Sequence, residues 1–124
     1  MSTLVTPAAL RIGPIALDAP VVLAPMAGIT NRAFRRLCRQ YGNDGLAAGG
    51  AGGASSLYVS EMITTRALVE RTPVTMKLVE FDAEEQPRSM QLYGVDPATV
   101  RAAARDIVEN DRADHIDMNF GCPV

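Results

Sequence analysis

The fold is decided by the stretch His115-Ile-Asp-Met-Asn-Phe-Gly-Cys-Pro-Val124. Apolar and polar side chains alternate from Ile116 to Phe120, which is the two-residue period of a β-strand whose two faces differ. Gly121 ends the alternation, and Cys122 follows it directly. A polar amide, a permissive glycine and a thiol therefore lie together at the carboxyl end of a predicted strand. Barrels of parallel strands carry their chemistry at that end.

The composition is typical of a soluble globular protein. The chain has 124 residues, of which 48% are hydrophobic and 21% charged, enough for one small domain. No apolar run approaches the ~18 residues that indicate a membrane span, and no secretory signal pattern is present. The two cysteines, Cys38 and Cys122, are too few for a disulfide framework. We therefore predict a cytoplasmic protein without membrane association. The net charge of −2 argues weakly against a general nucleic-acid-binding module.

Strands alternate with helical segments along the chain. Residues 10–17 resemble a short hairpin around Gly13-Pro14. Asp96-Pro97 is a strong helix start. The alternation predicts parallel β/α units and thus an α/β fold. The other expected elements are buried strands at 21–24, 57–62 and 88–93 and helices at 31–41 and 65–71, whereas residues 77–81 fit a strand or a helix.

The first predicted helix has an apolar face and an arginine face. Thr30 is expected to cap it and Gly42 to end it. We expect the apolar face, with Cys38, to pack in the core and the arginine face to be solvated; phosphate contact by the arginines is the alternative. The Gly/Ala-rich residues 43–56 are interpreted as a flexible insertion. The apolar set is Ala33, Phe34, Leu37, Cys38 and Tyr41, and the basic set is Arg32, Arg35, Arg36 and Arg39.

Polar or turn residues follow each of the four predicted strands. They are Pro25–Gly28, Ser60–Met62, Gln91–Gly94 and Asn119–Pro123. Because the carboxyl ends of parallel strands meet at one edge, these segments are expected to form one site. Four strands do not close an eight-stranded barrel. The chain is therefore either an open four-stranded sheet or the first half of a longer protein, and its ending favours the second.

The motifs in these segments, taken in order, resemble those of the tRNA-dihydrouridine synthases. The residues that carry the resemblance are Leu23–Gly28 with Thr30-Asn31, Tyr58–Met62, Gln91–Gly94 and Asp117–Pro123, and Glu84–Ser89 points to the bacterial general-type branch. The resemblance implies a (β/α)8 TIM barrel that binds FMN, followed by a small helical domain. Residues 1–20 would be an N-terminal segment with a hairpin. Residues 21–124 would be the first half of the barrel, about four β/α units, with the remaining barrel and the helical domain absent.

The resemblance also implies an activity and roles for individual residues. NADPH would reduce the flavin, and the flavin would reduce uridine in tRNA to 5,6-dihydrouridine. Pro25, Met26, Ala27 and Gln91 would bind FMN. Asn119 would contact the uracil, and Cys122 would donate the proton to C5. The full-length protein is expected to be a monomer that binds tRNA and uses no metal.

The residue types suit this chemistry. A thiol with an ordinary pKa of about 8.5 is mostly protonated at neutral pH and can donate a proton. The amide of Asn119 offers a donor and an acceptor to the uracil edge. Gln91 lies in an apolar strand, where a buried amide needs partners that a flavin would supply. Glu61 is interpreted as a loop-orienting or solvated residue without chemistry, and His115 as a surface residue.

Two other functions are compatible with the same residues. The first is an FMN barrel that reduces a free pyrimidine, which a basic face around the site would argue against. The second is a non-enzymatic half-barrel that binds flavin poorly and acts at most as an interaction fragment. Without its neighbouring motif, Cys122 would be interpreted as a buried structural thiol, because free cysteine is among the most buried residue types.

Overall fold

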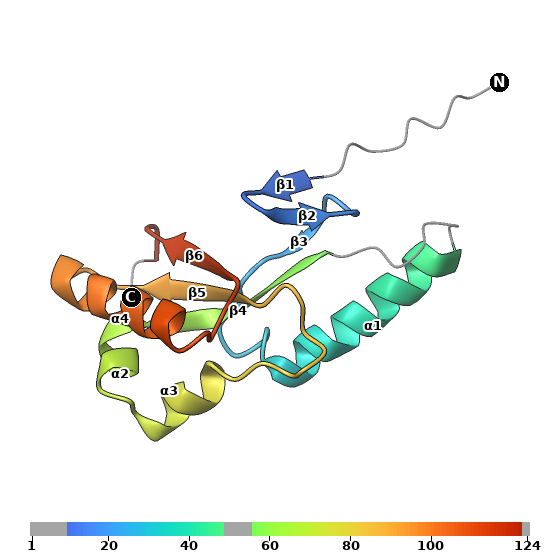
Figure 1. Ribbon diagram of the computed structural model, residues 1–124. Helices are drawn as coiled ribbons and strands as arrows, with labels where there is room; N and C mark the ends of the chain where they lie inside the picture. Colours follow the sequence, from blue (N-terminus) through green and yellow to red (C-terminus); the bar gives the residue numbers. More distant parts are fainter. Residues whose placement is uncertain (1–9, 49–55, 123–124) are drawn as a thin grey trace.

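A parallel sheet organises the chain in the computed structural model, which describes residues 10–48 and 56–122 (Figure 1). Its four strands are hydrogen-bonded in chain order, β3-β4-β5-β6, and a separate antiparallel hairpin, β1-β2, precedes them. The strands are β1 (Leu10–Ile12), β2 (Ile15–Leu17), β3 (Val22–Leu23), β4 (Leu57–Thr64), β5 (Ser89–Tyr93) and β6 (His115–Asn119). The helices are α1 (Arg32–Ala48), α2 (Thr65–Val69), α3 (Pro73–Leu78) and α4 (Pro97–Glu109).

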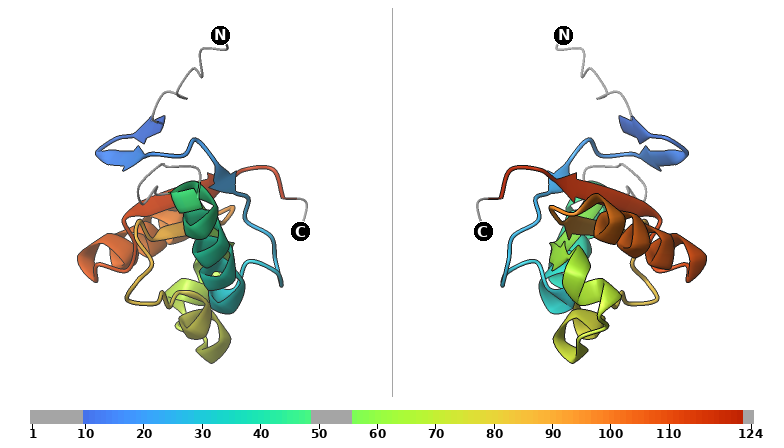
Figure 2. Two further views of the ribbon diagram at one scale, coloured as in Figure 1. Left: turned by 90° about the vertical axis from the view of Figure 1, so that its right-hand side faces the viewer. Right: turned by 90° about the vertical axis from the view of Figure 1, so that its left-hand side faces the viewer.

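The helices all lie on one face of the sheet, and the hairpin lies on the other side (Figures 1 and 2). A doubly wound sheet would reverse its strand order and carry helices on both faces. Sequential order with one-sided helices is instead the arrangement in the wall of a β/α barrel. The predicted α/β fold with a parallel sheet is confirmed. Closure into a barrel stays a prediction.

The main core lies between the sheet and helices α2 and α4. Asp96 caps α4 by accepting a hydrogen bond from the Thr99 amide at 2.7 Å, with Pro97 in the first turn, as predicted. The helix then turns Ala103 and Ile107 onto the sheet, where both are fully buried. The buried core residues are Ile63, Leu68, Val79, Met90, Leu92, Ala103 and Ile107.

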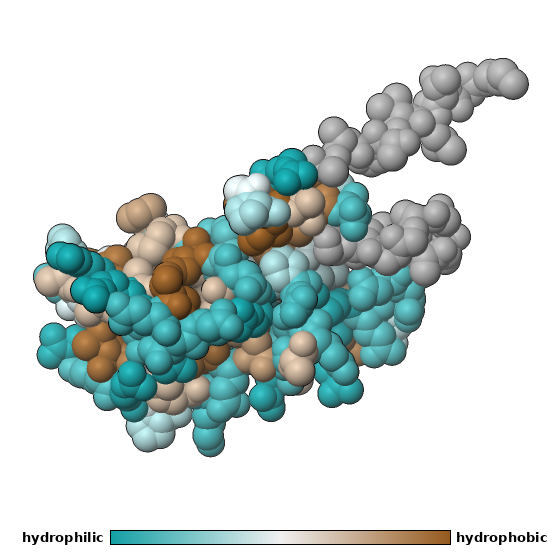
Figure 3. Space-filling model, viewed as in Figure 1, coloured by the Kyte–Doolittle hydropathy of each residue, from teal (hydrophilic) through white to brown (hydrophobic). Residues whose placement is uncertain are grey.

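A second cluster joins the hairpin to the start of the sheet. Leu17 is fully buried against Leu57 and Val59. The predicted hairpin is thereby confirmed, with Gly13 at a positive φ of 57° in its turn. Figure 3 shows hydrophobic surface beneath this hairpin and near β6 and α4, whereas the surface over α1 is mostly hydrophilic.

The prediction for the faces of α1 was wrong in part, although Arg32 and Arg36 are exposed as predicted. Arg35 and Arg39 face the protein, whereas Leu37 and Tyr41 are 49% and 68% exposed. Cys38, predicted to lie in the core, is only half-buried. The apolar pattern failed because the partner of Arg35 is Glu85, a carboxylate 50 residues further along the chain.

The predicted ends of α1 also need correction. The helix begins at Arg32, and the side chain of Asn31, rather than that of Thr30, accepts a hydrogen bond from the Phe34 amide at 3.0 Å. Gly42 does not end the helix, which continues to Ala48 through the first part of the predicted insertion. A Cβ at Gly42 would lie 2.5 Å from the Tyr58 hydroxyl oxygen. The glycine is thus explained by a close approach to β4.

Other boundaries differ locally from the sequence-based expectations. The first parallel strand is short, and Val22 is 44% exposed rather than buried on both faces, because β3 is an edge strand of this sheet. Residues 73–78 form α3, so Lys77 and Leu78 are helical and residues 79–81 are neither helix nor strand. Residues 49–55 of the predicted insertion lie outside the described residues. None of the described helices is long and apolar enough to span a membrane.

Arg35 and Glu85 form an ion pair in which both side chains are only 2% exposed. The Nε and Nη2 groups of Arg35 donate to the two carboxylate oxygens at 2.7 and 3.0 Å. Its Nη1 group donates to the Thr30 carbonyl at 2.9 Å, and the Phe81 ring stacks 4.9 Å from the guanidinium carbon. Because a bidentate pair with further hydrogen bonds offsets much of its desolvation cost, this arrangement fixes α1 against the loop that precedes β5.

We predict that removing one partner of this pair strongly destabilises the protein. Glu85→Gln or Arg35→Met should lower the free energy of unfolding by about 3–5 kcal/mol, because an unpaired charge or orphaned donors stay buried. Urea unfolding measures the change. Arg32→Met, which removes the surface ion pairs with Glu80 and Asp82, should cost no more than about 1 kcal/mol. Equal losses for the buried and surface variants would contradict the prediction.

A second charged cluster lies where β5 and β6 begin. Arg88 donates to Asp111 at 2.8 Å and to both carboxylate oxygens of Asp114 at 2.8 and 3.0 Å. The hydrogen bonds from Arg88 hold the pKa of Asp114 below its usual value. The Arg88 guanidinium therefore joins the amino ends of two neighbouring strands.

We predict an acid-sensitive contribution to stability from Asp114. Because its folded pKa is lowered, the contribution is complete above the unfolded pKa of about 3.9 and is lost as the pH falls through the folded pKa. Asp114→Asn should therefore be less stable than the parent at pH 7, with the difference shrinking below pH 4. Urea midpoints measured between pH 7 and pH 3 test this, and a constant difference would contradict it.

Candidate active site

A row of polar side chains lies on the face of the sheet that carries no helix. On β5 and β6, Met90, Leu92, Ile116 and Met118 contribute to the core beneath the helices. The alternate residues therefore face the other way. Gln91 and Asp117 are register partners across the two strands, and Asn119 lies two pairs further toward the carboxyl edge, opposite Tyr93.

These three side chains form a hydrogen-bonded chain. Gln91 Nε2 donates to Asp117 Oδ2 at 2.5 Å. Asn119 Nδ2 donates to Gln91 Oε1 at 3.4 Å and contacts the Met62 sulfur at 3.6 Å. Gln91 is 6% exposed, so its partners come almost entirely from the protein.

The chain of hydrogen bonds continues into the segment that carries Cys122. Asn119 Oδ1 accepts hydrogen bonds from the backbone amides of Gly121 and Cys122, both at 3.0 Å. An asparagine that binds the backbone two and three residues further on stabilises a local turn. The Cys122 thiol is free and half-buried. Asn119 thus fixes the course of the backbone that presents this thiol.

The turn between β3 and α1 is held from two sides. The Met26 carbonyl accepts hydrogen bonds from the Ile29 and Thr30 amides, and the Met26 amide donates to Thr30 Oγ1 at 3.0 Å. Gly28 has a positive φ of 73°, a conformation that suits glycine. Its amide donates to Glu61 Oε1 at 2.5 Å. Hydrogen bonds within the protein therefore fix the shape of this turn.

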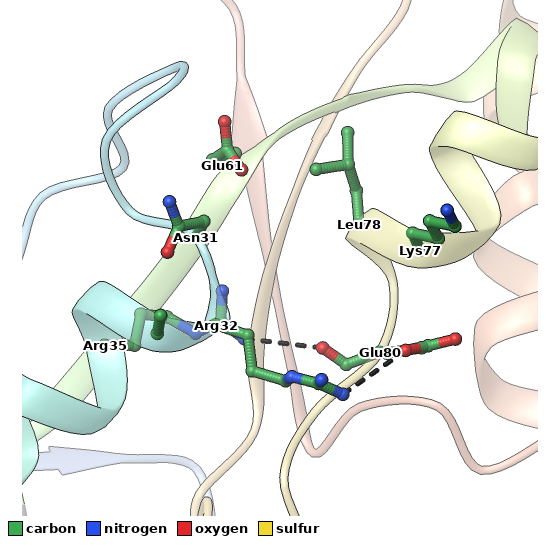
Figure 4. Close-up of a pocket in the computed structure, with 8 residues that line it drawn as sticks. Asn31, Arg32, Arg35, Glu61, Lys77, Leu78 and Glu80 are labelled. Atoms are coloured by element: carbon green, nitrogen blue, oxygen red, sulfur yellow. Dashed lines mark hydrogen bonds and ion pairs between the residues drawn. The ribbon is translucent and has the colours of Figure 1, made fainter.

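Glu61 lies on β4 beside a pocket between α1 and α3 (Figure 4). The pocket is on the helical side of the sheet, because residues of α1 and α3 line it. Arg32 and Glu80 close one side of it with an exposed ion pair at 3.3 Å. The pocket is thus distinct from the polar row on the helix-free face.

The structure brings together three of the six predicted site residues. Gln91, Asn119 and the backbone of Cys122 are joined by hydrogen bonds. The other three, Pro25, Met26 and Ala27, lie at the same end of the parallel sheet, and no hydrogen bond among the described residues joins them to that group.

One sequence-based argument was wrong. The Gln91 amide does not need a cofactor to satisfy it, because Asp117 and Asn119 do so. Two further residues were not predicted from the sequence: Asp117 had no expected role, and Thr30, which is fully buried, was expected only to cap a helix. The alternation around Asn119 already placed Asp117 on the same face, but only the register between β5 and β6 shows that it meets Gln91. His115, predicted to be a surface residue, begins β6 half-buried, with Nδ1 2.9 Å from Ser89 Oγ.

Comparison with known proteins gives a consistent family. The family model described as dihydrouridine synthase matches residues 22–124, from the first parallel strand onward. The chain belongs to the dihydrouridine synthase family. A "Probable tRNA-dihydrouridine synthase" of Mycobacterium tuberculosis is 64% identical over 116 residues, which are 94% of this chain and 28% of that protein. The "tRNA-dihydrouridine synthase B" of Pseudomonas aeruginosa is 40% identical over 113 residues, 91% of this chain and 30% of that protein.

Family membership confirms the resemblance found in the motifs. The chain spans about three-tenths of the length of these curated relatives. No solved structure matches the chain significantly. Within residues 10–48 and 56–122, no group of three or more His, Cys, Asp or Glu side chains is arranged to hold a metal ion.

We predict that Glu61 protects the Gly28 amide. A hydrogen bond to a charged group contributes about 1.5–3 kcal/mol, so Glu61→Ala should speed hydrogen exchange at that amide by about tenfold or more. Glu61→Gln keeps an acceptor and should have a smaller effect. Amide exchange followed by NMR measures the rates, with Glu84→Ala, on an exposed loop, as the control. Unchanged Gly28 exchange in Glu61→Ala would contradict the assignment.

Proposed function

We propose that this chain forms part of an enzyme that reduces uridine to 5,6-dihydrouridine in tRNA, with FMN as cofactor and NADPH as the source of electrons. Membership of the dihydrouridine synthase family and the names of the relatives support the reaction and the substrate. The observation that carries the proposal is the contact of Asn119 with both Gln91 and the Cys122 backbone. It joins a proposed cofactor ligand to the proposed proton donor.

The described residues fit a flavin. An amide side chain has two donors and two acceptor lone pairs. The hydrogen bonds to Asp117 and from Asn119 use one of each on Gln91, which leaves one N–H and one lone pair for the ring. At the β3–α1 turn, Ala27 is exposed, and no described residue accepts a hydrogen bond from its amide. We propose that Pro25, Met26, Ala27 and Gln91 hold FMN.

The protein's own groups would complete the reaction. When bound, FMN would supply the hydride for C6 of the uracil, and NADPH would reduce the flavin again. We assign the proton that reaches C5 to Cys122 Sγ; the thiolate left behind takes a proton from water. One N–H of the Asn119 side chain contacts only the Met62 sulfur, which is a poor acceptor. A uracil carbonyl is a better acceptor and would replace that sulfur. With tRNA as the substrate, we place the enzyme in the cytoplasm.

The test uses a chimera in which this chain replaces the matching segment of the Mycobacterium tuberculosis relative. The purified chimera should show flavin absorbance and reduce uridine in tRNA that lacks dihydrouridine. A chimera without flavin would overturn the proposed cofactor. Reduction of free uracil or uridine as fast as that of tRNA would favour the pyrimidine-reducing alternative.

Within this chimera, Cys122→Ala should keep the flavin and lose the reaction. Removing a general acid costs about 10²- to 10⁴-fold in rate. Cys38→Ala is the matched control, because this second thiol lies on α1 and should affect neither the colour nor the rate by more than a small factor. Loss of flavin from Cys122→Ala would instead assign that residue to cofactor binding.

A further inference from the structure

Asp117 lies at the centre of the polar row and has so far no part in the proposed reaction. It is half-buried on β6, directly opposite Gln91. Its Oδ2 atom accepts the 2.5 Å hydrogen bond from Gln91 Nε2, the shortest contact of the row.

A carboxylate accepts hydrogen bonds and donates none, so it fixes the direction of its neighbour. Gln91 must turn its nitrogen toward Asp117, and its oxygen then faces Asn119. Asn119 must in turn offer its nitrogen to Gln91. This leaves the Asn119 oxygen for the other side, where it meets the Gly121 and Cys122 amides.

The backbone amides at the other end of this series of hydrogen bonds impose the same direction. Backbone amides are donors only, so the Gly121 and Cys122 amides require an oxygen from Asn119. Donors and acceptors therefore match at every link from Asp117 to Cys122. Turning over either side-chain amide would set two donors or two acceptors against each other. A buried amide held in this way is costly to reorient.

We infer that Asp117 is a positioning residue that orients the Gln91 amide and, through Gln91 and Asn119, steadies the backbone turn that carries Cys122. The series of hydrogen bonds from Asp117 to Cys122 consists of contacts within the protein. Its meaning for catalysis rests on the proposed function, because Gln91 is a proposed flavin ligand and Cys122 the proposed proton donor.

The first experiment needs neither flavin nor tRNA. Cys38 and Cys122 are the only cysteines of the chain, so Cys38→Ser leaves Cys122 as a single thiol. In this background, Asp117→Ala should raise the rate of Cys122 labelling by a thiol reagent about 3- to 10-fold, the equivalent of a weakened hydrogen bond. Asp117→Asn keeps an oxygen that accepts from Gln91 and should stay within about twofold of the parent.

The comparison of Asp117→Ala with Asp117→Asn is decisive because both remove the same charge. Glu109→Gln, on the exposed face of α4, is the control for a change in net charge elsewhere. Urea midpoints of each variant separate local loosening from global unfolding. If Asp117→Ala does not fold, Asp117→Ser takes its place, since its hydroxyl is too short to reach Gln91. Equal labelling rates for the parent, Ala and Asn variants would overturn the inference.

The second experiment measures FMN affinity in the chimera by quenching of flavin fluorescence. Asp117→Ala should raise the dissociation constant about tenfold, as expected for a misoriented amide, and Asp117→Asn less than about threefold. An unchanged dissociation constant in Asp117→Ala would overturn the role toward Gln91. If the parent chimera binds no flavin while the labelling rates differ as expected, the proposed function fails and the positioning of the Cys122 turn by Asp117 stands.

Discussion

The buried ion pair between Arg35 and Glu85 holds together three separate segments beside the sheet, one of which is the β3–α1 turn at its carboxyl edge. Arg35 donates hydrogen bonds to three segments. They are the loop before β5 through Glu85, the residues after α3 through the Glu80 carbonyl, and the β3–α1 turn through the Thr30 carbonyl. Thr30 in turn binds the Met26 amide with its hydroxyl. A pair of charges this deeply buried is tolerated only because each has several partners, and one of these partners, the Thr30 carbonyl, belongs to the β3–α1 turn.

Carboxylates recur as fixed acceptors around the site. Glu85 receives Arg35, Glu61 receives the Gly28 amide, and Asp117 receives the Gln91 amide. Each carboxylate comes from a different strand or loop than the donor it holds, so each ties two parts of the fold together. The residues proposed for catalysis and cofactor binding are neutral by comparison. The charged residues hold the neighbouring segments in position, as expected around a site whose side chains must keep a defined geometry.

The sequence predicted what depends on local pattern and failed where a distant partner decides. The order of strands and helices, the start of α4 at Asp96 and the hairpin follow from short-range signals. The faces of α1 do not, because Glu85 makes Arg35 a buried residue from 50 positions away and β4 requires Gly42 to lack a side chain. The motifs selected Gln91, Asn119 and Cys122 as candidate site residues, and the structure joins the three by hydrogen bonds. Their connection through Asp117 needed the strand register, which the sequence does not contain.

The direction of the hydrogen bonds from Asp117 to Cys122 limits what the site can bind. Because the protein orients both side-chain amides, a ligand bound at Gln91 would meet one spare N–H and one spare lone pair rather than an amide that turns to suit it. Because these side chains are ordered when the protein folds, binding does not have to order them. This favours a ligand whose edge offers an acceptor for the spare N–H and a donor for the spare lone pair. The same direction carries a constraint: a substitution at Asp117, which has no assigned contact with FMN or uracil, would act on both Gln91 and the turn at Cys122.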